Sequence, residues 1–497
     1  MGFKFKWKYL FVILCLFLVF KIHLDFHKGY NYPLISDEWT LFAQASRLSE
    51  GANIEEEGTN SKYISAIIIP TAFLYKIGIN AAWHDEKLAS FLTALSALCV
   101  YLLLRKRFGE IAGFAGMLFF AGLPSNLNIL GTAFFIPLTA AMPFVYLAIN
   151  LFEKPVTLKN TALFAIAWIL IGAIHPLSFI YSTIAFFIAL TARLHDANKK
   201  IGIFLGVLGI LIAGMLLKTF PFLIFPKTYV YYIVGFNFVL LYGLLSFILA
   251  FIGMFFAWKK CRTLVLWAVF GFLMIWVYEL FGFSLFVSRE RVIYLLMVGL
   301  VPLSAVGFAY IFNKLWKLNV KNHLGKISAL VFLIACILFL AMNRMQIPDQ
   351  RLHPSPQFGT QYELKSLEKM TNFTGRMLVP MELSLPAQAI TGNPTVSCAY
   401  YYVCLNNSGY EDLIRTNLTK TFYSGNCDEQ RLALKRMSRM FDGKYRPDYL
   451  LYYGNLSCQW QYTAVKSMRL VNVDWGDREP IRYYNITGLT EYFANMT

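Results

Sequence analysis

Two adjacent carboxylates, Asp37 and Glu38, are the residues whose types and spacing most clearly suggest chemistry. Neighbouring like charges repel and each tends to raise the pKa of the other, so a purely stabilising role is hard to assign to the pair. A carboxylate at this position could accept a proton from an attacking hydroxyl, or bind a divalent cation such as Mg or Mn. The alternative is a solvated loop. Apolar residues at helical spacing follow the pair and predict a short amphipathic helix in the membrane interface, with both acids at its N-terminus: Leu41, Phe42, Ala45 and Leu48.

Basic residues near the ends of apolar segments are the candidates for holding a phosphate. Arg289 and Arg291 open a late apolar segment, shortly after Glu279, and Lys62 lies in the same predicted loop as the acidic pair. Arginine presents a planar fork of donors that matches phosphate oxygens. The alternatives for the two arginines are a snorkelling anchor or an ion pair with Glu279 or Glu290.

Three further ionisable residues are site candidates because charged groups near a membrane are costly. His175 interrupts the apolar stretch 161–192 and is predicted at the outer tip of a hairpin of two spans, where it either belongs to the site or caps the turn. Glu279 lies near the outer end of a span. Asp85 is a weaker candidate, because it stands where it would cap and charge the N-terminus of the next span.

The composition places these residues on a membrane protein. Of the 497 residues, 57% are hydrophobic and only 15% are charged. This excludes a soluble domain and predicts a polytopic α-helical protein in contact with membrane lipids. The net charge of +17 belongs mainly to residues 1–348, so lipid headgroups explain it better than nucleic acid, and no nucleic-acid partner is predicted.

The arrangement of basic loops predicts the orientation of the chain. The positive-inside rule keeps 63–79 on the outer side as a juxtamembrane or re-entrant helix, and makes 25–86 one large outer loop. It also places the N-terminus in the cytoplasm and the C-terminal region outside the cell membrane. About eleven spans are predicted, the first at about 9–20 and the others at roughly 88–104, 111–123, 130–152, 161–174, 177–192, 201–217, 234–257, 263–281, 291–311 and 327–342.

The C-terminal region, 346–497, is predicted to be a small extracytoplasmic α/β domain that follows the membrane domain, 1–345. It contains all six N-glycosylation sequons of the chain, which begin at Asn372, Asn406, Asn417, Asn455, Asn485 and Asn495. It also holds an even set of cysteines that permits two disulfides in any of three connectivities: Cys398, Cys404, Cys427 and Cys458. Segments 376–380, 448–453 and 468–473 are predicted as strands. A helix is predicted over 429–441, ended by Gly443.

These features together resemble the GT-C superfamily of membrane glycosyltransferases, which use sugars carried on a polyprenyl or dolichyl phosphate. The resemblance covers residues 1 to about 345 and rests on four features, of which the acidic pair is the sharpest. They are Ser36-Asp37-Glu38-Trp39 after the first span, the juxtamembrane helix, the basic end Arg105-Lys-Arg-Phe-Gly109, and Arg289 or Arg291 ahead of a span with Pro302. The resemblance implies inversion at the anomeric carbon, with one carboxylate as the base.

Two departures narrow this expectation. The Trp-Trp-Asp-Tyr-Gly motif of oligosaccharyltransferases is absent, and 124–131 contain no carboxylate for their second acidic site. Transfer of a single sugar, a hexose or pentose, to a hydroxyl of a glycan, lipid or protein acceptor is therefore favoured. The competing predictions are a transporter or flippase, which would place its charged groups at the bilayer midplane and show internal repeats, and a receptor-like surface protein.

Overall fold

The computed structural model describes residues 7–25, 32–33, 36–51, 65–123, 131–132, 134–219, 224–226, 239, 242–317, 324–345, 361–371, 373–396, 410–443, 445–453, 458, 469–474 and 481–495. The chain forms two compact units. The first contains Met1–Lys28 and Glu86–Arg351, and the second contains Gly29–Asp85 and Leu352–Thr497.

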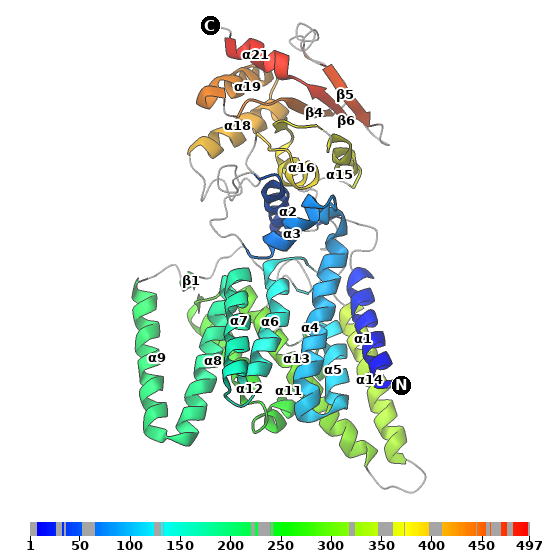
Figure 1. Ribbon diagram of the computed structural model, residues 1–497, viewed down its shortest axis with the longest axis vertical. Coiled ribbons are helices and arrows are strands. Elements are labelled where there is room, and N and C mark those ends of the chain that lie inside the picture. The colour runs from blue at the N-terminus through cyan, green and yellow to red at the C-terminus, as the bar shows by residue number, and fades with distance from the viewer. Residues whose placement is uncertain are drawn as a thin grey trace. The chain divides into compact units, whose positions relative to one another are not determined.

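Apolar helices build the first unit, and several of them run side by side in Figure 1. They are α1 (Trp7–Leu24), α4 (Asp85–Phe108), α5 (Glu110–Ala121), α6 (Pro137–Phe152), α7 (Leu158–Ile174), α8 (Pro176–Ala197), α9 (Lys199–Thr219), α11 (Leu244–Ala257), α12 (Arg262–Phe281), α13 (Arg289–Trp316) and α14 (Leu324–Met345). Each predicted span corresponds to one of them. Five of them are long and apolar enough to cross a membrane over their described residues: α4, α8, α9, α12 and α13.

Helix α13 is the centre of this unit. The most apolar 18-residue stretch of the helix is completely buried, and the helix packs against α5, α11, α12 and α14. Two glycines allow its close approach to α11, since a Cβ atom added at Gly253 or Gly307 would overlap the carbonyl oxygen of Leu303 or Leu249, respectively. Small residues at helix contacts are typical of membrane bundles, because they let backbones approach closely. The beginning of α13, with Arg289 and Arg291, is therefore attached to the best-packed element of the unit.

Irregular segments join the helices of this unit in a few places. A short antiparallel pair links β1 (Ile224–Pro226) to β2 (Phe283–Leu285), the segment that lies between α12 and α13. Gly282 ends α12 in the left-handed conformation, with φ of 73°, where a side chain would be strained. The chain therefore turns sharply between Glu279 and Arg289, which brings the two charged side chains together.

The second unit contains a four-stranded sheet with the order β3-β4-β6-β5. Strand β3 (Met377–Leu378) pairs in parallel with β4 (Tyr449–Tyr453), whereas β6 (Ile481–Asn485) pairs antiparallel with both β4 and β5 (Arg469–Asp474). The three strands expected from the sequence are present. The fourth, β6, was not predicted, although it occupies an inner position of the sheet.

Helices pack on this sheet through an apolar core. Figure 1 shows α18 (Tyr410–Ser424), α19 (Cys427–Arg439) and α21 (Thr487–Asn495) together beside the strands. Their buried side chains form one cluster with residues of β3, β4 and β6: Leu378, Leu418, Phe422, Leu434, Met437, Leu450, Tyr484, Leu489 and Phe493. The predicted helix over 429–441 corresponds to α19 and the short 3-10 turn η9 (Met440–Gly443) that follows it. The unit is an α/β fold with a core of its own.

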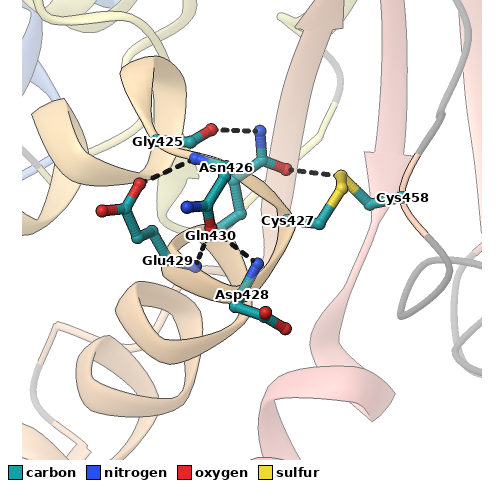
Figure 2. Close-up of a disulfide and its surroundings, with 7 residues drawn as sticks. All are labelled: Gly425, Asn426, Cys427, Asp428, Glu429, Gln430 and Cys458. Carbon is teal, nitrogen blue, oxygen red and sulfur yellow. Dashed lines mark hydrogen bonds between the residues drawn. A yellow bond between two sulfur atoms is a disulfide. The ribbon is translucent and has the colours of Figure 1, made fainter.

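One disulfide is defined, between Cys427 and Cys458. Of the three possible connectivities, the structure has the one that pairs Cys427 with Cys458. Cys398 and Cys404 lie outside the described residues. Figure 2 shows the disulfide beside the N-terminus of α19, where a capping box closes the helix. Asn426 accepts hydrogen bonds from the amides of Asp428 and Glu429, and the Glu429 carboxylate accepts one from the Asn426 amide at 2.8 Å.

The described helices of the predicted outer loop 25–86 pack with C-terminal residues. Helices α2 (Ser36–Ser49) and α3 (Ile68–Lys76), with the 3-10 turn η2 (Ala81–His84), contact each other, and α2 packs against α16 (Ser384–Thr391). Three hydrogen bonds join distant parts of the sequence in this unit: Tyr32 to Glu368, Tyr75 to the Ala389 carbonyl, and Asn80 to the Ile390 carbonyl. The acidic pair thus belongs structurally to the unit that contains the C-terminal domain.

Candidate active site

Helix α2 positions the acidic pair. It begins at Ser36, and Asp37 and Glu38 occupy its first turn, as the sequence predicts. Carboxylates are favoured there because the N-terminal end of a helix carries a partial positive charge. The pair is therefore compatible with the helix electrostatically, and the repulsion between the two acids is partly offset.

The two carboxylates have opposite environments. Asp37 is exposed, whereas Glu38 is completely buried. Successive residues of a helix point about 100° apart, which accounts for the difference. Only Asp37 presents a carboxylate that an external substrate can reach, and Glu38 is held inside the protein.

The helix that carries the acids is buried in protein. The prediction of an amphipathic helix with one face in the membrane interface was wrong, because Trp39 and 41–46 are all buried. Helices α3 and α16 cover α2, and Tyr32 stacks on Trp39 with ring centroids 6.4 Å apart. The hydrophobic periodicity of the helix was misleading, because the polar residues Gln44 and Ser46 are buried in the protein as well. The first turn is consequently fixed by packing on several sides.

In the first unit, α13 carries the two arginines. Arg289 donates a hydrogen bond from Nη2 to Glu279 Oε1 at 2.6 Å, and its guanidinium lies 4.6 Å from the centre of the Tyr278 ring. This is the ion pair that the sequence analysis offered as an alternative to phosphate binding. Part of the Arg289 fork is therefore already in use, and Arg291 lies half-buried in the first turn of the same helix.

His175 lies between α7 and α8 and caps the second of these helices. Its Nδ1 accepts a hydrogen bond from the Ser178 amide at 3.1 Å. An amide can only donate, so Nδ1 carries no proton and the neutral ring carries its proton on Nε2. Burial, together with the positive charge of Arg291, lowers the pKa of His175 to about 3. The capped-turn alternative is thus realised, and the ring is a neutral donor under physiological conditions.

The structure says less about the two remaining candidates, Asp85 and Lys62. Asp85 is buried and begins α4, directly after η2. Lys62 lies outside the described residues. Tyr32 and Glu368 were not singled out from the sequence, although their hydrogen bond of 2.6 Å holds the segment that leads to α2. The two residues are 336 positions apart in the sequence, so no local sequence pattern could have predicted their contact.

The acidic pair differs in exposure, which bears on the predicted metal site. A divalent cation that used both carboxylates would need them to converge, whereas one is exposed and the other is inside the protein. Among the described residues, no three His, Cys, Asp or Glu side chains gather in a cluster that could hold a metal ion. A site for Mg or Mn at the acidic pair therefore stays a prediction.

Comparisons with known proteins establish the fold. No protein-family model matches the sequence, and no curated protein is similar to it. Among solved structures, the chain is similar to the oligosaccharyltransferase AglB from Archaeoglobus fulgidus in complex with an inhibitory peptide and a dolichol-phosphate. The TM-score is 0.54 and the identity 13%, over 91% of this chain and 70% of that one.

Two further structures agree. ArnT from Cupriavidus metallidurans, bound to undecaprenyl phosphate, matches with a TM-score of 0.52 and 11% identity over 98% of this chain and 99% of that one. A structure of the Archaeoglobus oligosaccharyltransferase with zinc and sulfate matches with a TM-score of 0.51 and 13% identity, over 88% of this chain and 67% of that chain. The fold expected from the resemblance is confirmed, because the chain shares its architecture with AglB and ArnT.

Proposed function

We propose that the protein is an inverting glycosyltransferase that moves a single sugar from a polyprenyl or dolichyl phosphate to an acceptor hydroxyl at the outer face of the membrane. The observation that carries the proposal is the match to ArnT over nearly the full length of both chains. The AglB comparison leaves almost a third of that chain uncovered. The match in length thus favours an enzyme similar to ArnT, which was solved bound to undecaprenyl phosphate.

Asp37 is the proposed general base. Attack by the acceptor hydroxyl requires removal of its proton as the new glycosidic bond forms, and a base must reach that proton. Asp37 is exposed and fixed in the first turn of a well-packed helix, whereas the buried Glu38 is proposed to position that turn. The proton passes to Asp37, the bond between the anomeric carbon and the phosphate oxygen breaks, and the lipid phosphate leaves with the bonding electrons.

Arg291 is the proposed ligand of the lipid phosphate. The leaving group gains negative charge as it departs, and a guanidinium stabilises that charge better than it stabilises the intact donor. Arg289, partly occupied by Glu279, would hold the beginning of α13 in place. Lys62 is proposed as a second cation on the sequence evidence alone. His175 carries a neutral Nε2–H in the same unit, and its pKa is lowered by burial and by the positive charge of Arg291.

The test compares donors with the purified protein. One donor is a polyprenyl-phosphate-linked monosaccharide and the other is a polyprenyl-pyrophosphate-linked oligosaccharide offered with a peptide that contains a sequon. We expect the first to release free polyprenyl phosphate and to yield an acceptor one sugar heavier, with the opposite anomeric configuration. Transfer of only the oligosaccharide, to asparagine, would overturn the proposal. Uptake of the lipid-linked sugar into sealed vesicles without bond cleavage would favour a flippase instead.

A further inference from the structure

Helix α19 in the second unit has a strongly basic exposed face. Arg431, Lys435, Arg436 and Arg439 follow one another at helical spacing, so they lie on one side of the helix. Arg431, Arg436 and Arg439 are exposed and Lys435 is half-buried. The opposite side, with Ala433, Leu434 and Met437, is buried in the core of the unit. The basic residues are thus presented outward by a helix whose rotation is fixed.

A shallow, open depression lies on this face. A pocket of about 320 Å³ is lined by three cations and two apolar side chains: Leu432, Lys435, Arg436, Arg439 and Met440. Leu432 is 48% exposed, so it offers apolar contact area at the edge of the pocket. The basic pocket, as we call these five residues, combines cations with an apolar surface that a sugar ring or its substituents can contact.

The charge of the basic pocket is not neutralised within the described part of the chain. Neither Lys435 nor Arg436 forms an ion pair there, and the same holds for the neighbouring Arg431. Arg439 donates from Nε to the Phe493 carbonyl at 2.8 Å, which orients its guanidinium without neutralising it. The helix dipole favours cations in the last turn only weakly. This effect does not explain why Lys435, Arg436 and Arg439 gather around one depression.

Covalent and capping interactions hold α19 at its other end. The Cys427–Cys458 disulfide and the capping box of Asn426 and Glu429, drawn in Figure 2, fix the first turn of the helix. The Gln430 amide adds a hydrogen bond to the Gly425 carbonyl at 3.3 Å. A pocket built on so well-anchored a helix loses little conformational entropy when it binds a ligand, because its backbone is already ordered.

We propose that the basic pocket binds an anionic group of the acceptor, so that the acceptor is a glycan carrying phosphate or carboxylate substituents. The inference rests on the proposed function for the identity of its ligand as an acceptor. Two guanidinium groups supply planar forks that match phosphate or carboxylate oxygens, and the exposed Leu432 contacts the adjoining sugar. The depression can admit a discrete anionic group beside the apolar edge that Leu432 provides.

The experiment measures binding rather than transfer, with the full-length protein in a neutral detergent. Fluorescently labelled dextran sulfate is the probe, and neutral dextran of the same length is its control. Arg436→Glu should weaken binding of the sulfated probe by about tenfold or more, because it replaces a charge-assisted contact by repulsion. The matched variant is Lys365→Glu, which makes the same charge change at an exposed position of α15 (Gln361–Leu367), outside the pocket. It should change the affinity by less than about twofold.

Every outcome decides the proposal. Selective loss in Arg436→Glu, with unchanged melting temperature, supports it. Equal weakening in both variants would show attraction to the net charge alone and overturn it, as would absence of binding. Displacement of the probe by bicelles rich in phosphatidylglycerol, but not by phosphatidylcholine, would assign the surface to lipid and also overturn it. Asp37→Asn should bind the probe normally, so a failure of the proposed transfer reaction would be seen separately from a failure of this site.

Discussion

Asp37→Asn and Glu38→Gln should fail in different ways, although the two positions are adjacent. Asp37 is exposed at the start of α2, so its replacement by an amide of the same size should leave folding intact. As the proposed base, it should slow transfer by about a hundredfold, at the lower end of the general-base range. This corresponds to about 2.7 kcal/mol of lost transition-state stabilisation. Donor binding should survive.

Glu38→Gln should instead destabilise the protein. The carboxylate is completely buried, so the groups around it inside the protein would meet an amide in its place. Such a replacement costs about 1–3 kcal/mol, or more when a charge is involved. For a unit of about 200 residues, each kcal/mol lowers the melting temperature by about 2–4 °C, so a fall of roughly 2–12 °C is expected. Transfer by the fraction that remains folded should fall less than in Asp37→Asn.

Two measurements separate the effects. Turnover with saturating lipid-linked sugar, normalised to folded protein, reports on the base, and a thermal unfolding curve in detergent reports on stability. Tyr32→Phe is a useful control because it removes the hydrogen bond to Glu368 in the same unit and leaves Asp37 and Glu38 unsubstituted. If Asp37→Asn unfolds and Glu38→Gln keeps its stability but loses turnover, the roles assigned from burial are reversed. If both variants transfer sugar normally, the acidic pair has no catalytic role.

Three further predictions concern the remaining features. Replacing Cys427 and Cys458 by serine should destabilise the second unit by about 4 kcal/mol, the entropy of closing a loop with a separation of 31 residues, measured by unfolding with and without reductant. Asn417→Gln should remove one N-glycan, seen as faster gel migration in a glycosylating host, because the side chain is exposed on α18. For His175, burial near Arg291 holds the pKa at about 3, below the ordinary value of 6.5, so its stabilising contribution is present above pH 6.5 and falls as pH drops towards 3. His175→Asn, which keeps a helix cap, should flatten that pH dependence of the melting temperature.

The helices of the first unit could be predicted because local composition determines them. A run of about twenty apolar residues has few alternatives in a membrane, and every predicted span contains a helix. Boundaries were less exact where a helix continues into charged residues, as α4 does through Arg105 to Phe108 and α13 does to Trp316. Neither difference moves a candidate site residue.

Prediction of the second unit was less complete for two reasons. Strand β6 was missed, although it lies between β4 and β5 and carries the buried Tyr483 and Tyr484. A five-residue strand carries a weak periodic signal, even though its neighbour β5 directly precedes it in the sequence. The burial of α2 was missed because α16, which covers it, begins almost 350 residues later. A hydrophobic pattern shows that a face needs a partner and does not show which segment supplies it.

The way in which α2 is held bears on the choice between an enzyme and a transporter. A coupling carboxylate of a transporter is expected within the membrane helices, where it can respond to alternating access. Asp37 and Glu38 belong instead to the unit with its own sheet, and three long-range hydrogen bonds tie their segment to the C-terminal residues. The same unit carries the basic pocket on α19. One folded body therefore contains both the proposed base and the proposed acceptor contact, an arrangement that suits group transfer because the base and the acceptor hydroxyl must meet in a fixed geometry.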